Sequence, residues 1–62
     1  MIIYEVVSMF FNDGKVKVAL HTYELDKKPE NRFIETPRCD RYHDFFTCKK
    51  EAYKHYEDAK RA

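Results

Sequence analysis

The sequence contains no tryptophan, one glycine, two prolines and two cysteines among its 62 residues. Two cysteines allow at most one internal disulfide, which excludes a densely cross-linked scaffold. No apolar run approaches the roughly 20 residues that a membrane-spanning helix needs, and the N-terminus lacks the features of a secretory signal. We therefore expect a cytoplasmic protein with reduced thiols, no membrane association and no cofactor.

The chain also lacks a large excess of either charge. Twelve basic and eleven acidic residues give a net charge of +1, without the one-sided basic balance of a protein held mainly by phosphates. Residues 1–62 form a single domain, which at this size buries only about 60% of the surface of the unfolded chain. Five tyrosines and five phenylalanines are more than so small a core readily encloses. This surplus indicates a binding surface or self-association.

The N-terminal part of the chain predicts a β-hairpin. Residues 2–11 are rich in β-branched and aromatic side chains, which suit a pleated strand. Residues 15–25 alternate between two faces, and the Asp13-Gly14 pair between the two segments is a strong hairpin signal. The sequence therefore predicts two long antiparallel strands joined by a tight turn.

Two registers fit this hairpin. A two-residue loop places Phe11 opposite Val16, whereas a three-residue loop starting at Asn12 places Phe10 opposite Val16. The choice matters because a slip of one residue sends every side chain of a strand to the other face. We favour the two-residue loop, because it builds one consistently apolar face.

In the favoured register the second face of the hairpin is the candidate working surface. It is too apolar to be left in water and too polar for a sealed core, and exposed apolar patches often mark interaction sites. The predicted partner-binding residues are Tyr4, Val6, Phe10, Lys17, His21 and Tyr23.

The rest of the chain predicts one more strand and one helix. Residues 41–46 form the third strand, residues 32–36 are a short extended segment ended by Pro37, and residues 47–61 form a helix with Thr47 at its N-cap. The expected fold is α+β: a three-stranded antiparallel sheet, made of the hairpin and a third strand, with the C-terminal helix on one face. The predicted core residues are Val7, Met9, Phe11, Val16, Val18, Leu20, Phe46, Cys48, Ala52, Tyr56 and Ala59.

Two kinds of chemistry can be drawn from the cysteines and histidines. The four residues Cys39, His43, Cys48 and His55 are types that bind zinc, although their C-x3-H-x4-C-x6-H spacing matches none of the common zinc motifs. Cys48 at the start of a helix could also be a reactive thiol with His43 nearby, but the sequence offers no orienting acid. We expect neither a metal site nor catalysis.

Nucleic-acid binding is the alternative function. The candidate surfaces are the sheet face, with Lys15, Lys17, His21 and nearby aromatic side chains for stacking on bases, or the basic side of the helix, with Lys49, Lys50 and Lys54. The order of three strands and a helix, with Phe45-Phe46-Thr47 leading into Lys49-Lys50-Glu51-Ala52, resembles the small N-terminal DNA-binding domains of phage-type tyrosine recombinases. The resemblance implies a sheet that enters the major groove and a helix behind it.

The favoured interpretation is a small non-catalytic protein-interaction module, such as a regulator, inhibitor or adaptor. Its partner would be another protein or a second copy of the chain, bound through the exposed sheet face. The surplus of aromatic side chains carries this interpretation.

Overall fold

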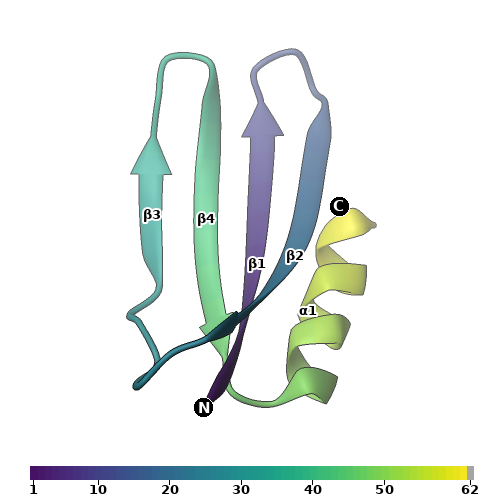
Figure 1. The fold of residues 1–62 in the computed structure, drawn as a ribbon. Coiled ribbons are helices and arrows are strands. Elements are labelled where there is room, and N and C mark those ends of the chain that lie inside the picture. Colours follow the sequence, from purple (N-terminus) through teal and green to yellow (C-terminus); the bar gives the residue numbers. More distant parts are fainter. Residues whose placement is uncertain (62) are drawn as a thin grey trace.

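The computed structural model describes residues 1–61, which form a curved antiparallel sheet with one helix (Figure 1). The elements are, in chain order, β1 (Ile2–Phe11), β2 (Val16–Glu24), β3 (Arg32–Glu35), β4 (Cys39–Phe46) and α1 (Lys49–Lys60). The strand order across the sheet is β2-β1-β4-β3, so two hairpins lie side by side and β1 pairs with β4 at the centre. The predicted α+β fold with an N-terminal hairpin and a C-terminal helix is confirmed.

The sheet has four strands, so the prediction of three was wrong. The segment predicted only as extended, residues 32–36, supplies β3 and pairs with β4 through a short turn. Thr36 closes that turn, because its hydroxyl donates to the Cys39 carbonyl at 2.8 Å and accepts from the Cys39 amide at 3.1 Å. The fourth strand also departs from the order of three strands and a helix on which the recombinase resemblance rested.

The register of the first hairpin also differs from the favoured one. Phe10 pairs with Val16, as in the three-residue loop, and not Phe11 as favoured above. Gly14 has a φ of +90°, a conformation that costs other residues energy, and the Asp13 carboxylate accepts the Lys15 amide at 3.0 Å. A three-residue loop that ends in a glycine of this conformation therefore determines the register.

Because directly paired residues share a face, this register assigns each strand residue to one of two faces. The helix face carries α1, as shown by the His55 imidazole of α1, which lies 2.9 Å from the Asp44 carboxylate of β4. Asp44 pairs with Val6, so the even-numbered residues of β1 belong to the helix face and the odd-numbered residues to the opposite face.

The predicted core is consequently divided between the two faces. Val16, Val18 and Leu20 pair with even-numbered β1 residues and lie on the helix face, where they are half-buried. The other predicted β1 core residues, Val7, Met9 and Phe11, lie on the opposite face. Only Val7 of this predicted hairpin core is buried.

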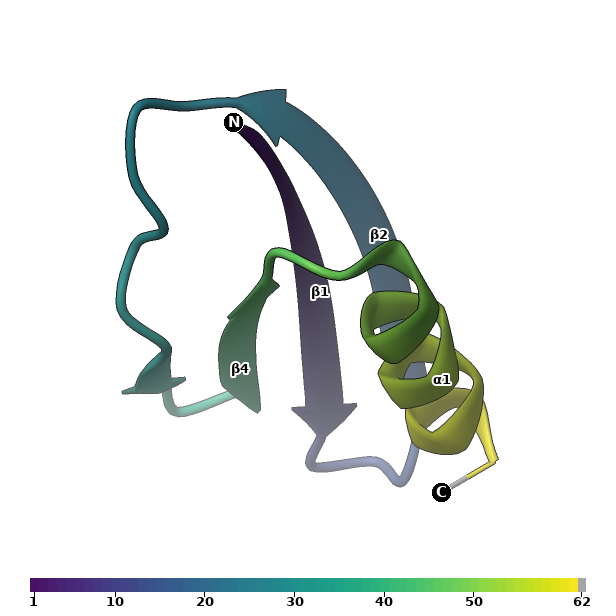
Figure 2. The same ribbon diagram turned by 90° about the horizontal axis from the view of Figure 1, so that it is seen from below.

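Burial is greatest over residues 3–8 of β1, and it extends to both faces of the sheet. Ile3 and Val6 project to opposite faces, yet both are completely buried. Figure 2 shows that the connection between β2 and β3 lies on the side of β1 and β4 away from α1. Within this connection, Asn31 accepts the Phe45 amide at 2.7 Å and holds the chain across the end of the sheet. The opposite face therefore has its own small core, including Phe45.

The helix packs against the sheet through small residues, and its N-cap lies one residue later than predicted. Cys48, not Thr47, occupies the N-cap position, and its side chain makes no capping hydrogen bond. Cys48 is exposed, so its predicted place in the core was wrong. Ala52 is completely buried, which lets the helix backbone approach the sheet closely, and Tyr56 is half-buried beside it.

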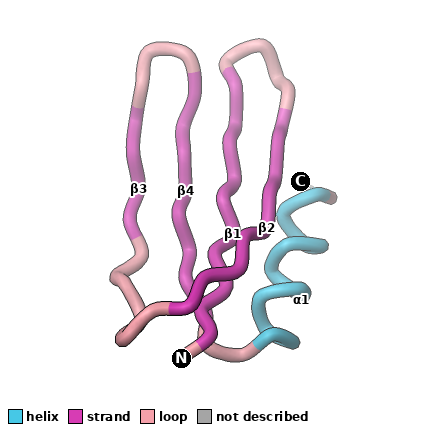
Figure 3. Tube along the Cα trace, in the orientation of Figure 1, coloured by secondary structure: helices cyan, strands magenta, loops and turns pink. Residues whose placement is uncertain are grey.

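The turns of the two hairpins lie next to each other at one end of the sheet (Figure 3). The Asn12 side chain donates to the Pro37 carbonyl at 2.6 Å, and the Asn12 amide donates to the Arg38 carbonyl at 3.1 Å. Over residues 1–61, α1 is the only helix, and its twelve residues are too short and too polar to span a bilayer.

Candidate functional site

The helix covers only part of its face of the sheet. Among the described residues, α1 contacts β2, β1 and β4 but makes no contact with the edge strand β3. A groove of about 390 Å³ runs between α1 and the sheet. Its lining includes Phe10, Tyr42 and Asp44 from the sheet and His55 and Asp58 from the helix.

A row of three aromatic rings forms the sheet side of this groove and continues to the edge of the sheet. The Phe10 and Tyr42 rings meet edge to face with centroids 5.7 Å apart, and the Phe33 and Tyr42 rings lie 4.7 Å apart. Tyr42 pairs with Phe33 across β4 and β3, so the row crosses the strands. Phe33 is 50% exposed and Tyr42 is 39% exposed, although aromatic rings of this size usually find cover in a core.

Carboxylates surround the aromatic row. Asp40 pairs with both Phe10 and Glu35, which places two acids on the helix face one row away from Tyr42. Asp44 and Asp58 line the groove itself. Asp44 holds His55 at 2.9 Å, and Asp58 has only a long 3.9 Å contact with Arg61. The surface is therefore apolar at its centre and acidic at its rim.

The opposite face contains a buried polar network at Glu5. Tyr23 donates its hydroxyl hydrogen to Glu5 Oε1 at 2.9 Å, and His43 Nδ1 lies 3.0 Å from Glu5 Oε2. The hydrogen bond to Glu5 raises the pKa of the Tyr23 phenol, with smaller contributions from burial and from the Glu5 charge. Tyr23 is thus a neutral donor at physiological pH and not an activated phenolate. The network joins three strands, because Glu5 is on β1, Tyr23 on β2 and His43 on β4.

The residues predicted to bind a partner do not form one surface. Tyr4, Val6 and Phe10 lie on the helix face, where Val6 is completely buried. The other three, Lys17, His21 and Tyr23, lie on the opposite face. The error follows from the register, because the favoured loop moved β2 by one residue relative to β1.

Sequence reasoning missed Phe33 and Tyr42, the most exposed members of the aromatic row. Phe33 was placed in an extended segment and Tyr42 in a strand, but nothing local indicated that β3 pairs with β4. The available signal was a large aromatic side chain in each of two short β-rich segments separated by Pro37. Only the pairing brings these two rings together.

The four residues of the zinc hypothesis are dispersed. Cys39 and His43 lie on the opposite face, whereas His55 is on the helix side of the sheet and Cys48 is exposed before α1. Residues 1–61 contain no group of three or more metal-ligating side chains arranged to hold an ion. The two cysteines are both unpaired thiols in the structure, and only Cys39 is buried.

The lysines of the nucleic-acid hypothesis belong to two separate elements. Lys49, Lys50 and Lys54 are exposed on α1, and the ammonium group of Lys49 lies 5.8 Å from the Tyr53 ring centroid. Lys17 lies on the opposite face of the sheet, and Lys15 precedes it in the turn beside Asp13. The structure therefore offers two distinct basic surfaces.

Comparison of the chain with protein-family models, curated proteins and solved structures gave no match. A fold does not by itself determine function, since one fold serves many activities. Function must therefore be inferred from the groove and from the charges on the two faces.

Proposed function

We propose that this protein is a non-catalytic interaction module that binds a segment of another protein in the groove between α1 and β4. The observation that carries the proposal is the row of aromatic rings Phe10, Tyr42 and Phe33, which α1 leaves half uncovered. Exposed aromatic side chains in a concave, largely apolar setting are typical of interaction hot spots.

The shape of the surface favours a partner segment with an apolar anchor. A groove of about 390 Å³ accommodates one or two large side chains but is at the small end for a small-molecule site. The Tyr42 ring touches two other rings, so its position is restrained before a partner binds. Such preorganisation lowers the entropy lost on binding.

The charges at the rim favour a basic partner. Asp40, Glu35 and Asp58 lie around the apolar centre, and among the described side chains Asp40 and Glu35 have no ion pair. An arginine or lysine next to the apolar anchor would meet these carboxylates. Complementary charge of this kind favours specificity and the rate of association.

The same charges argue against self-association through this face. A two-fold dimer places identical patches against each other, and here it would bring the acidic rims of the two copies, with Asp40, Glu35 and Asp58, into one interface that lacks compensating basic strand residues. We therefore propose a different protein as the partner in preference to a homodimer.

The test is selection from a displayed library of random peptides, followed by measurement of affinity with the purified protein. We expect the enriched peptides to carry an aromatic or large aliphatic residue beside arginine or lysine. Phe33→Ala should weaken binding at least tenfold, since truncating a hot-spot aromatic residue commonly costs about 2 kcal/mol or more. Tyr53→Ala is the matched control, because Tyr53 is 45% exposed but lies on α1 outside both the aromatic row and the groove lining.

Three outcomes would contradict the proposal. The first is the absence of any enriched peptide, and the second is equal weakening by Phe33→Ala and Tyr53→Ala. The third is a stable dimer at micromolar concentration in native mass spectrometry that Phe33→Ala dissociates. Circular dichroism should show that both variants retain the fold, as expected for substitutions of half-exposed residues.

A further inference from the structure

The charged residues within the strands are separated by sign between the two faces of the sheet. Every acidic strand residue except Glu5 lies on the helix face, and every lysine and arginine of the strands lies on the opposite face. The helix-face residues are Glu24, Glu35, Asp40 and Asp44, and the opposite-face residues are Glu5, Lys17, Arg32 and Arg41. This separation is independent of the groove, which is on the other side of the sheet.

The single acid among the strand residues of the opposite face is buried and held by hydrogen bonds within the chain. Glu5 is 7% exposed, and both of its oxygens are engaged, one by Tyr23 and the other by His43. In the part of the chain that the structure describes, Lys17, Arg32 and Arg41 form no ion pair. The strand residues of this face therefore present only positive charge to solvent. The connection between β2 and β3 adds two acids and two lysines, Asp26, Glu30, Lys27 and Lys28, which carry no net charge together.

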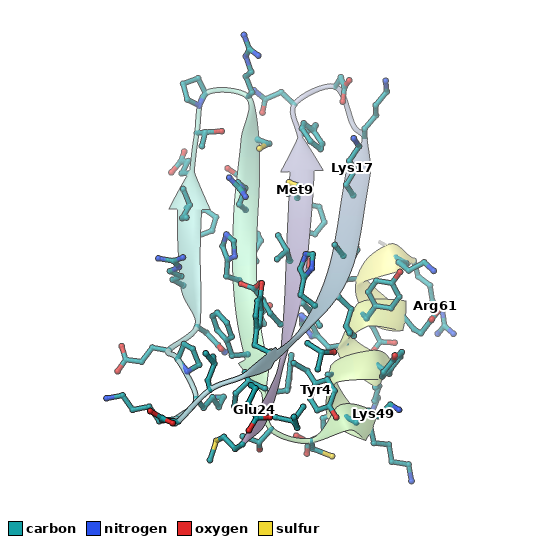
Figure 4. The ribbon with its side chains drawn as sticks, viewed as in Figure 1. Tyr4, Met9, Lys17, Glu24, Lys49 and Arg61 are labelled. Carbon is teal, nitrogen blue, oxygen red and sulfur yellow. The ribbon has the colours of Figure 1, made fainter. Side chains whose placement is uncertain are left out.

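The cations surround an apolar centre. Met9 of β1 pairs with Lys17 on one side and with Arg41 on the other, so the Cα atoms of these two basic residues are about 10 Å apart, two strand spacings. Figure 4 shows Met9 and Lys17 toward the turn end of the sheet, beyond the end of α1. Arg32, one row away on β3, is the third cation.

Two exposed rings lie on the same face, further along β2 from Lys17. His21 and Tyr23 of β2 are on the same face, with ring centroids 6.3 Å apart, and Tyr23 is 41% exposed. The hydrogen bond to Glu5 holds the Tyr23 ring in place. Sheets that bind single-stranded nucleic acid combine such rings, on which bases stack, with cations that contact phosphates.

We propose that the opposite face binds single-stranded nucleic acid, with Lys17, Arg32 and Arg41 contacting phosphates and His21 and Tyr23 stacking on bases. The rings favour a single strand over a duplex, because only unpaired bases present their flat faces to a side chain. This inference goes beyond the protein-binding groove and does not depend on it.

The experiment measures fluorescence anisotropy of a labelled 20-nucleotide single strand, with RNA and DNA in separate arms, at salt concentrations between 50 and 200 mM. Three phosphate contacts predict a slope of log K against log salt of about −2, which weakens binding roughly twentyfold over this range. Lys17→Gln and Arg32→Gln should each weaken binding about fivefold at 50 mM salt and reduce the slope by about 0.7. Both residues are exposed, so these variants should fold normally.

Matched controls separate this surface from the other two. Lys54→Gln removes an exposed lysine from α1, and Phe33→Ala alters the aromatic row on the helix face, so both should leave nucleic-acid binding unchanged. Loss of binding in Lys54→Gln but not in Lys17→Gln would overturn the proposal. So would the absence of binding at 50 mM salt, tighter binding of a duplex, or equal binding of vesicles containing anionic lipid, which would indicate a site for any polyanion.

Discussion

The hydrogen bond between Tyr23 and Glu5 should contribute measurably to stability, and Tyr23→Phe isolates it. The substitution removes one hydroxyl and leaves the ring, which pairs with Ile3 on the same face of the sheet. Glu5 would lose one of its two polar contacts while remaining 7% exposed. A buried carboxylate with an unmet hydrogen bond is costly, since water cannot fully replace the lost donor.

The expected loss of unfolding free energy depends on how deeply Glu5 and Tyr23 are each buried. A hydrogen bond to a charged group contributes about 1.5–3 kcal/mol when both partners are buried. Here the acceptor is buried but Tyr23 is 41% exposed, so water can partly replace the hydroxyl and we expect a loss of about 1 kcal/mol. For a domain of this size, that loss lowers Tm by roughly 4–8 °C.

The control is Tyr53→Phe. Tyr53 is 45% exposed, and its hydroxyl makes no hydrogen bond to any other described residue, so the same chemical change should alter Tm by less than about 2 °C. Urea unfolding and thermal unfolding at pH 7 measure both variants. Adding Glu5→Gln to complete a double-mutant cycle should reveal a coupling of about 1 kcal/mol between Glu5 and Tyr23. If the two tyrosine variants have equal stability, the network does not stabilise the fold and the reasoning fails.

Three further predictions concern the same half of the molecule. Because the pKa of Tyr23 is raised, the stability that Tyr23 contributes should be complete below about pH 10 and should disappear as the pH rises through the raised pKa. The difference in unfolding free energy between wild type and Tyr23→Phe should therefore shrink above about pH 10. A constant difference up to about pH 12 would contradict the pKa direction. Ile3→Val should lower the free energy of unfolding, measured in urea, by about 0.5–1.5 kcal/mol, because Ile3 is completely buried. Ile2→Val, at a neighbour that is 45% exposed, should change it very little. Equal effects of the two substitutions would argue against the burial of Ile3. Gly14→Ala should lower the free energy of unfolding by about 1 kcal/mol in the same assay, because a residue with a side chain is strained at the φ of +90° found here. No larger loss is expected, since no neighbouring atom would clash with the added methyl group. An unchanged urea midpoint would indicate a different turn.

Local patterns in the sequence were sufficient to place most of the elements. The β-branched run of residues 2–11 became β1 with the same bounds, and the alternation after Gly14 became β2. The helical periodicity after Thr47 became α1, with Ala52 facing the sheet as expected. These features depend on neighbours in the chain, so propensity and periodicity reveal them.

The candidate site was less predictable, because it depends on pairings between distant segments. Phe33 and Tyr42 are nine residues apart and meet only when β3 pairs with β4. The four residues of β3 carry too little pattern to predict that pairing. The predicted common face of Phe10 and Lys17 was wrong for the related reason that the pairing of β1 and β2 differs by one residue from the favoured register.

The sequence alone determined that this chain has a hairpin, a further strand and a C-terminal helix, since each of these is encoded in contiguous residues. The tertiary structure decided the register, the fourth strand and the faces on which charges and rings gather. The physical reason is that side chains alternate along a strand, so one step in the hydrogen bonding of β1 and β2 moves Lys17 and Tyr23 from one side of the sheet to the other. That single step separates an acidic, aromatic face from a basic one.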